Sequence, residues 1–346
     1  MENIEKLDHV EHLEDSYNPV GWLHLLCAPT RDTRMSVKYD GAPSLVFGSH
    51  PQNGMFFVAT KAFFNKTPRV FYNQHDIARG CDNKNLAKTL SYCLELLPTL
   101  FPSGCTGLYQ ADVMFRQDEL FRRAGLVCAK PNTIVYGTED ESVLNYKLGI
   151  AVHTEYVDRG GKLVPVPVST EFSSNKAVYV FPVDIPTKGL LKKVECDDRT
   201  PYITSFWWEK LKRFRNHRAR FGMDANPLDV EASFRVWMDF EHKKDLNSVK
   251  TLKAKQRKEE AFREVMATFE PEHLVNYWNY QQGVVGVKEN LIDKLDTMSP
   301  GIFKPFFENG KGLVPTGHEG YVLFDGYHST KLVKRHVFSA ENFKQD

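Results

Sequence analysis

Lys38 is followed closely by an aspartate and a glycine, and then by a short segment rich in apolar residues. Residues 36 to 47 read Ser-Val-Lys-Tyr-Asp-Gly-Ala-Pro-Ser-Leu-Val-Phe. A lysine amine that loses contact with water and has its pKa lowered becomes a nucleophile. Asp40 is close enough in sequence to help set the charge and orientation of that amine, and Gly41 lets the backbone approach a ligand closely. The same residues also fit a hairpin turn that carries a solvated lysine.

The tetrapeptide Lys-x-Asp-Gly at Lys38 resembles motif I of the covalent nucleotidyltransferases, which include ATP-dependent DNA and RNA ligases and mRNA-capping enzymes. In that superfamily the lysine attacks the α-phosphate of a nucleotide and carries the nucleotide as a phosphoramide. The resemblance implies that Lys38 is the nucleophile and that Asp40 orients it. It also implies that Val37, Tyr39 and Gly41 lie beside the bound nucleotide, and that further groups follow in a fixed order along the chain.

A basic residue follows the next predicted strand, residues 55–60. Lys61 takes the position where motif Ia usually has arginine, so the resemblance assigns it to the ribose or a phosphate of the nucleotide, as a point charge in place of a bidentate fork. Lys66 and Arg69 add positive charge nearby and are candidate contacts for nucleic-acid phosphates. The alternative for Lys61 is a surface lysine at the end of a strand.

An acid interrupts the apolar run Leu108–Phe115. Asp112 stands where motif III usually has glutamate, and the resemblance assigns it to a ribose hydroxyl or a metal-bound water. An acid is unusual in so apolar a run because burying an unpaired carboxylate is costly. The alternative is a buried acid paired with a structural lysine.

A histidine occupies the place of motif IIIa, which usually presents an aromatic ring. Strict alternation along residues 150–156 puts Ala151, His153 and Glu155 on one face of a strand. His153 is therefore the candidate to stack on the nucleotide base, with Tyr156 as the second choice. The alternative is a strand histidine that is hydrogen-bonded to its neighbour.

The run His-Glu-Gly-Tyr-Val at residues 318–322 resembles motif IV, in a form closer to the RNA ligases than to the DNA ligases. The resemblance places Glu319 beside the phosphates, where it helps to hold Mg²⁺, and Asp112 is the second candidate ligand of that metal. Phe324 stands where many members of the family have lysine.

The basic segment Thr330-Lys331-Leu332-Val333 resembles motif V, although Val333 replaces the second lysine of the usual pair. Lys331 would neutralise the α-phosphate and, by like-charge repulsion, help to keep Lys38 unprotonated. The segment fits a solvated basic strand equally well.

The composition is typical of a globular protein, with 42% hydrophobic and 26% charged residues in 346. The net charge of +1 gives no general affinity for nucleic acid, so such contacts must come from local patches. The six cysteines contain no Cys-x-x-Cys pair, which argues against a zinc site and a disulfide framework. With no export signal and no apolar run long enough to span a membrane, we expect a cytoplasmic monomer, in an infected host cell if the gene is carried by a phage.

The order of the patterns predicts an α+β protein. Residues 1–30 have helical spacing, residues 36–183 are mostly strands with one helix at 82–99, residues 205–298 are helical, and strands return at Gly320–Phe324 and Tyr327–Val333. We therefore expect a nucleotidyltransferase domain of the ATP-grasp-like ligase adenylation type, built of antiparallel sheets with helices. It would occupy residues 1–185 and 311–346 and be interrupted by an all-α insertion at 186–310.

The predicted insertion mixes tryptophans with basic residues, a composition that suits binding to a phosphate backbone and to bases. Its candidate nucleic-acid contacts are Lys212, Arg213, Arg215, Arg218 and Arg220. The alternative is a solvated helix face whose tryptophans pack inward. Fifteen residues follow Lys331 in this sequence, so we expect no OB-fold domain of the kind that follows motif V in DNA ligases and capping enzymes.

These resemblances together favour an ATP-dependent RNA ligase, most like the small bacteriophage enzymes. It would form lysyl-AMP with Mg²⁺ and join a 5′-phosphate end to a 3′-hydroxyl end of a polynucleotide, with RNA favoured over DNA. Three alternatives stay open. One is a DNA ligase, another is a nucleotidyltransferase with a different acceptor, and the third is a nucleic-acid-binding protein with a decayed ligase core.

Overall fold

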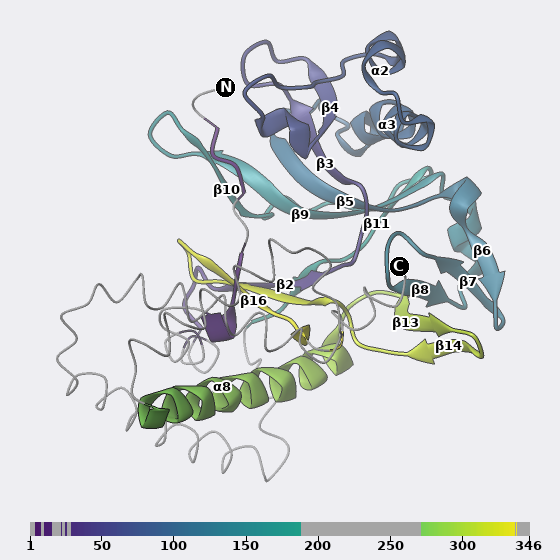
Figure 1. Ribbon diagram of the computed structural model, residues 1–346. Coiled ribbons are helices and arrows are strands. Elements are labelled where there is room, and N and C mark those ends of the chain that lie inside the picture. The colour runs from purple at the N-terminus through teal and green to yellow at the C-terminus, as the bar shows by residue number, and fades with distance from the viewer. Residues whose placement is uncertain are drawn as a thin grey trace. The chain divides into compact units, whose positions relative to one another are not determined.

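The computed structural model of the chain describes residues 4–7, 10–15, 22, 25, 29–187, 271–335 and 337 (Figure 1). The chain divides into two compact units. The first unit comprises Met1–Val10, Arg34–Ile185 and Met298–Phe324, and the second comprises Glu11–Thr33, Pro186–Thr297 and Asp325–Asp346. Strands outnumber helices among the described residues, and the predicted α+β class is confirmed.

A sheet of long antiparallel strands forms the body of the first unit. Its strand order is β10-β9-β5-β3-β4, and β11 pairs with β9 in parallel. The strands are β3 (Ser44–Ser49), β4 (Phe56–Thr60), β5 (Leu108–Arg116), β9 (Leu148–Asp158), β10 (Leu163–Pro167) and β11 (Val178–Val180). All six lie within residues 36–183, which the sequence predicts to be mostly strands.

Two helices follow β4 in the first unit, α2 (Gln74–Gly80) and α3 (Lys84–Leu96). The side chain of Asn73 caps α2 by accepting the Asp76 amide at 3.0 Å, and that of Asn83 caps α3 by accepting the Leu86 amide at 3.0 Å. The apolar face of α3 is buried and contacts β4 and β9. The predicted helix at 82–99 is confirmed, with a 3-10 turn, η3 (Leu97–Leu100), taking over where Pro98 enters.

A second set of strands carries the segment that contains Lys38. β2 (Arg34–Lys38) lies antiparallel to both β15 (Gly320–Phe324) and β12 (Asp184–Ile185). The Cα partner of Lys38 is Gly320, and that of Val37 is Tyr321. This pairing brings two distant parts of the sequence side by side in the first unit.

A third sheet combines a three-stranded meander with a hairpin, and the sequence patterns do not reveal most of its strands. Its order is β14-β13-β8-β7-β6, with β6 (Phe121–Arg123), β7 (Leu126–Ala129), β8 (Val135–Thr138), β13 (Lys304–Asn309) and β14 (Gly312–Pro315). The turn between β6 and β7 has positive φ at both Ala124 (51°) and Gly125 (81°), as a tight hairpin turn requires. Alanine is an uncommon residue at positive φ, so the usual turn signal is weak here.

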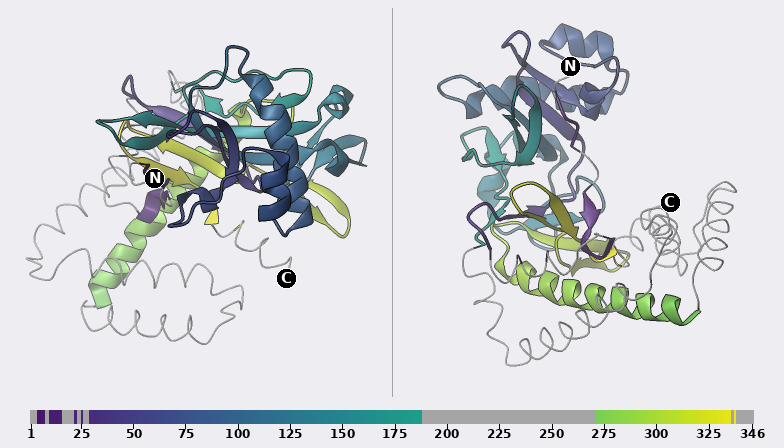
Figure 2. Two further views of the ribbon diagram at one scale, coloured as in Figure 1. Left: turned by 90° about the horizontal axis from the view of Figure 1, so that it is seen from above. Right: turned by 90° about the vertical axis from the view of Figure 1, so that its left-hand side faces the viewer.

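The second unit contains the long helix α8 (Pro271–Met298), a continuous rod in both views of Figure 2. It also contains β1 (Glu11–His12) and β16 (Ser329–Leu332), which pair in parallel. The ammonium group of Lys288 on α8 lies 2.6 Å from the Glu14 carboxylate, and both side chains are buried. The helical prediction for residues 1–30 is wrong at β1, and the one for 205–298 is confirmed over α8.

The basic residues Lys212, Arg213, Arg215, Arg218 and Arg220 lie outside the described residues. None of the helices that the structure describes is long and apolar enough to cross a membrane.

Candidate active site

Lys38 and Glu319 form an ion pair in the first unit, with the lysine Nζ donating to Glu319 Oε2. The register of β2 against β15 explains the contact, since Glu319 directly precedes the Cα partner of Lys38. The side chains are 33% and 23% exposed, so the pair is accessible to a ligand yet partly removed from water. The structure thus brings together the two residues that the sequence placed in motifs I and IV.

Glu319 carries a carboxyl group whose pKa is raised. Burial is the main cause, and the nearby charges of Asp40 and Asp112 act in the same direction, whereas the Lys38 ammonium lowers the pKa. Three acids therefore share the surroundings of one lysine. This concentration of negative charge favours a bound cation.

Asp112 lies on β5 beside Lys38 and His153. Burial would raise the pKa of this carboxyl, but contact with His153, the charge of Lys38 and a hydrogen bond from Ser44 outweigh it, so the pKa is lowered. His153 Nε2 is 3.8 Å from Asp112 Oδ2, and His153 Nδ1 is 2.8 Å from the hydroxyl of Thr154. The neighbour contact proposed as an alternative for His153 is therefore present, together with a contact to a second predicted site residue.

A β-bulge on β9 sets the position of His153. Gln110 pairs with Thr154 and the next residue of β5, Ala111, pairs with Val152, so His153 is the extra residue of the bulge. The predicted alternation along residues 150–156 is consequently wrong. Ala151 is the partner of Asp112 and Glu155 is the partner of Tyr109, three residues away on β5, so Ala151 and Glu155 face opposite sides of the sheet.

At Gly41, three residues after Lys38, the backbone passes close to β5. A Cβ atom at this position would lie 2.6 Å from Asp112 Cβ and 3.2 Å from the carbonyl oxygen of Val113. Two hydrogen bonds fix the same junction, from the Ala42 amide to the Val113 carbonyl and from the Val113 amide to the Pro43 carbonyl, both 3.0 Å long. Only glycine permits this contact, which sets Lys38 beside Asp112.

Asp40 holds the segment that precedes β8. Its buried carboxylate accepts hydrogen bonds from the Asn132 side chain at 2.7 Å, the Thr133 amide at 2.7 Å and the Ile134 amide at 2.9 Å. The Asp40 amide donates to the Tyr136 hydroxyl at 2.8 Å. These contacts make Asp40 a positioning residue for the strand that carries Lys38. Asn132 and Tyr136 are absent from the sequence-based set because nothing local links them to Asp40.

Val37 and Tyr39 flank Lys38, and both side chains are buried. The Tyr39 hydroxyl donates to the Pro182 carbonyl at 2.9 Å, and burial raises its pKa well above the usual range. The Tyr39 ring meets the ring of His318 edge-on, with centroids 5.3 Å apart. Both side chains are part of the buried core next to Lys38, and their contact with a nucleotide stays a prediction.

His318 supports the residue that follows it, Glu319. Its imidazole stacks on the ring of Tyr136, with centroids 6.2 Å apart, and its Nε2 lies 2.7 Å from the Ser299 hydroxyl. Burial, aided by the charge of Lys304, lowers the pKa of His318 to about 4, so the ring is neutral at pH 7. The sequence shows this histidine next to Glu319 but gives no sign that it is buried.

Four basic residues complete the predicted set, Lys61, Lys66, Arg69 and Lys331. Lys61 is exposed and directly follows Thr60, the last residue of β4. Thr60 pairs with Leu45 of β3, and the preceding residue, Ser44, pairs with Asp112 of β5. Lys61 therefore lies at the same end of the sheet as Asp112. Lys66 and Arg69 are exposed in the loop after Lys61. Lys331 belongs to the second unit, on β16 with His12 as its Cα partner.

A divalent cation would find two carboxylates here, Glu319 and Asp112. Among the described residues no group of three or more His, Cys, Asp or Glu side chains is arranged to hold a metal by itself. Mg²⁺ commonly binds through one or two carboxylates together with substrate phosphates. The donor set therefore fits a metal that arrives with a nucleotide.

Comparisons with known proteins define the family of the chain. No curated protein and no solved structure matches the sequence significantly. A family of unknown function, DUF6267, matches it over residues 7–203 and 187–346. These two matches extend over nearly all of the chain, and the protein therefore belongs to the DUF6267 family.

Proposed function

We propose that the protein is an ATP-dependent nucleotidyltransferase whose Lys38 carries AMP, and that it acts as an RNA ligase. The observation that carries the proposal is the Lys38–Glu319 ion pair, with Asp112 adjacent, at the junction of β2 and β5. Four residues predicted from separate motifs, Lys38, Asp112, His153 and Glu319, are neighbours in the first unit. The motif resemblances described above supply the reaction class.

The first step transfers AMP to the lysine. The Lys38 ammonium loses a proton to water, and the lone pair of Nζ attacks the α-phosphorus of ATP. The nitrogen–phosphorus bond forms as the bond from the phosphorus to the bridging oxygen breaks, and that oxygen leaves with the electron pair in pyrophosphate. Glu319 orients Nζ before attack through its hydrogen bond.

The nucleoside lies between the side chains that surround Lys38 in this proposal. Lys61 and Asp112 bind the ribose and phosphates, and His153 stacks on the base. Glu319 and Asp112 would hold Mg²⁺, which supplies neutralisation of phosphate charge when it is bound. The motif V resemblance also implies that Lys331, a residue of the second unit, neutralises the α-phosphate.

The second and third steps join polynucleotide ends. The AMP passes from Lys38 to a 5′-phosphate, and a 3′-hydroxyl then displaces AMP to form the phosphodiester. Lys66 and Arg69 contribute positive charge for the strand near Lys61, and the basic residues of 212–220 are further candidate contacts. RNA is the preferred acceptor because the Glu-Gly-Tyr-Val form of motif IV resembles the RNA-ligase branch.

The test is covalent labelling with ATP that carries a radioactive α-phosphate. Wild-type protein with Mg²⁺ should give a labelled band on a denaturing gel, and Lys38→Ala and Lys38→Arg should give none. Lys84→Ala removes an exposed lysine at the start of α3 and should label like wild type. Absence of label on the wild-type protein with every nucleoside triphosphate would disprove the enzymatic proposal.

A chase identifies the acceptor. Labelled protein is mixed with 5′-phosphorylated RNA or DNA strands, and the products are separated by length. Joined RNA supports the proposal in full, and joined DNA alone points to a DNA ligase. Loss of label without joined product points to a nucleotidyltransferase with another acceptor.

A further inference from the structure

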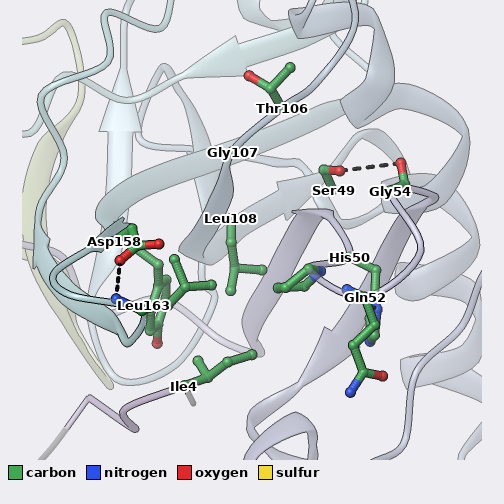
Figure 3. Close-up of a pocket in the computed structure, with 13 residues that line it drawn as sticks. Ile4, Ser49, His50, Gln52, Gly54, Thr106, Gly107, Leu108, Asp158 and Leu163 are labelled. Atoms are coloured by element: carbon green, nitrogen blue, oxygen red, sulfur yellow. Dashed lines mark hydrogen bonds between the residues drawn. The ribbon is translucent and has the colours of Figure 1, made fainter.

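A hollow of about 840 Å³ lies on the first unit at the far end of β3 from the candidate active site (Figure 3). It is enclosed by the end of β3, the start of β5, and the end of β9 with the turn that follows. Of the site residues named from the sequence, Tyr156, the second choice for stacking on the base, is among the residues that line it. We call it the His50 hollow, after the histidine that projects into it between Leu108 and Gln52.

His50 is built into an aromatic cluster. The side chain is only 5% exposed, and its ring meets those of Phe57, Phe63 and Tyr72 with centroids 5.3, 6.2 and 5.8 Å away. Burial lowers the pKa of the imidazole, so the ring is neutral at pH 7. Packing against these three rings fixes the orientation of the His50 imidazole and of its two nitrogen atoms.

The tautomer of His50 follows from its hydrogen bond. The Gln52 amide donates to Nδ1 at 3.3 Å, so in the neutral ring the proton is on Nε2. This is the imidazole's one hydrogen bond within the part of the chain that the structure describes. A preorganised N–H donor thus remains for a ligand that enters the hollow.

The lining selects against charged phosphate. It contains no Lys or Arg, and its one charged side chain is the carboxylate of Asp158, which already accepts the Gly161 amide at 2.7 Å. Leu108 and Tyr156 supply apolar surface, and Ser49 and Thr106 supply hydroxyl groups. A flat, uncharged ring with acceptor atoms at its edge, such as an unpaired nucleobase, fits this combination.

The position of the hollow relates it to the candidate active site. Ser44, at one end of β3, pairs with Asp112, and Ser49, at the other end, lines the hollow. Five residues of extended strand span about 17 Å. That distance is too long for the base and α-phosphate of one nucleotide, but it equals about five nucleotides of a stacked strand at about 3.4 Å each.

We propose that the His50 hollow binds one unpaired base of the polynucleotide substrate, about five nucleotides from the end that is activated at Lys38. The inference rests on the proposed function and adds a minimum substrate length to it. His50 Nε2 donates to an acceptor atom on the base edge, and Leu108 and Tyr156 contact its face.

The test uses fluorescently labelled single-stranded RNA with a 5′-phosphate, bound to the full chain and followed by fluorescence anisotropy without ATP. Affinity should rise steeply once the strand exceeds about five nucleotides. In a longer strand, removing the base at one position about five nucleotides from the 5′ end should weaken binding about tenfold, and His50→Ala should weaken binding of the intact strand equally. The two changes together should cost no more than either alone.

Two further variants separate binding from folding. Thr106→Trp fills the hollow from an exposed position and should weaken binding of the intact strand as His50→Ala does, with the fold intact. His75→Ala removes an exposed histidine on α2 and should bind like wild type. Lysine labelling by ATP should be unchanged in all three variants.

The outcomes distinguish the two proposals. The role of the hollow would be overturned if His50→Ala and base removal weakened binding additively. It would also be overturned if the affinity were the same whichever base is removed. Neither result would affect labelling at Lys38. A position-specific effect in a protein that never labels with a nucleotide would leave the hollow as a base-binding site and overturn the ligase proposal.

Discussion

Glu319 binds the ammonium group of Lys38 although 281 residues separate them in sequence. The contact depends on the antiparallel pairing of β2 with β15, which places Gly320 opposite Lys38. Both side chains stay partly exposed, at 33% for Lys38 and 23% for Glu319.

Substituting Glu319 tests this relationship. Glu319→Gln keeps the shape and an acceptor oxygen but removes the charge that orients the amine and helps to hold Mg²⁺. We expect the rate of lysine labelling to fall about a hundredfold, with the free energy of unfolding unchanged or slightly increased. The expectation for the free energy of unfolding follows from the raised pKa of Glu319, because burial destabilises the charged form of its carboxyl group.

The control for Glu319→Gln is Glu308→Gln. Glu308 also pairs with basic residues in the first unit, Arg123 and Lys130, but it lies on β13. This variant should label like wild type. Labelling of Glu319→Gln at the wild-type rate would show that Glu319 has no part in the reaction.

Asp40→Asn should destabilise the first unit. The carboxylate accepts three hydrogen bonds in a buried place, and an amide would turn a donor group toward at least one of those donors. We expect a loss of about 2–4 kcal/mol in the free energy of unfolding, measured by urea denaturation. Asp82→Asn, at an exposed position, should change it by less than about 0.5 kcal/mol. Wild-type stability with abolished labelling would instead make Asp40 a residue that acts on the substrate.

Gly41→Ala should also destabilise the protein, by overpacking. The added methyl group would meet the backbone and side chains of β5, and we expect a cost of about 1–3 kcal/mol. Gly286→Ala is the matched control, since nothing lies within 4 Å of a Cβ at that position of α8. There the same change should stabilise the helix by about 0.5–1 kcal/mol. Equal effects at the two glycines would contradict the close junction between Gly41 and β5.

His318 should make stability depend on pH. Its pKa is lowered to about 4 in the folded protein, so the unfolded chain binds the proton first as the pH falls below about 6.5. Stability from this group is complete above about pH 6.5 and is lost as the pH falls toward 4. Between about pH 7 and pH 5 the loss should be about 2 kcal/mol.

Comparing wild type with His318→Gln isolates this contribution, because the other titrating groups are common to both proteins. The wild-type protein should lose about 2 kcal/mol more than the variant over that range in urea denaturation. Parallel pH profiles for the two proteins would show that His318 titrates normally and is not buried as neutral imidazole.

Local patterns were sufficient for the long strands and insufficient for the short ones. β5 and β9 have apolar runs that exceed what a turn or loop would carry, so their location follows from sequence alone. β6 reads Phe-Arg-Arg, and β13 contains a proline, so neither has the alternation of a strand. These segments become strands because their partners complete a sheet, which is a tertiary effect.

The candidate site shows the same limit. The spacing around Lys38 and Glu319 identified both residues, but only the pairing of β2 with β15 shows that they touch. The position of His153 depends on a bulge, which shifts the alternation by one residue and leaves no mark in the pattern of apolar residues. The partners of Asp40 lie more than ninety residues away and could not be inferred from its neighbours.

The pairing of β2 with β15 also determines when the site exists during synthesis. Glu319 is made much later than Lys38, because 281 residues separate the two in sequence. Until then β2 lacks one of its neighbouring strands, and the amine lacks its carboxylate partner. Fragments that end before β15 should therefore give no covalent label with ATP, even though they contain Lys38.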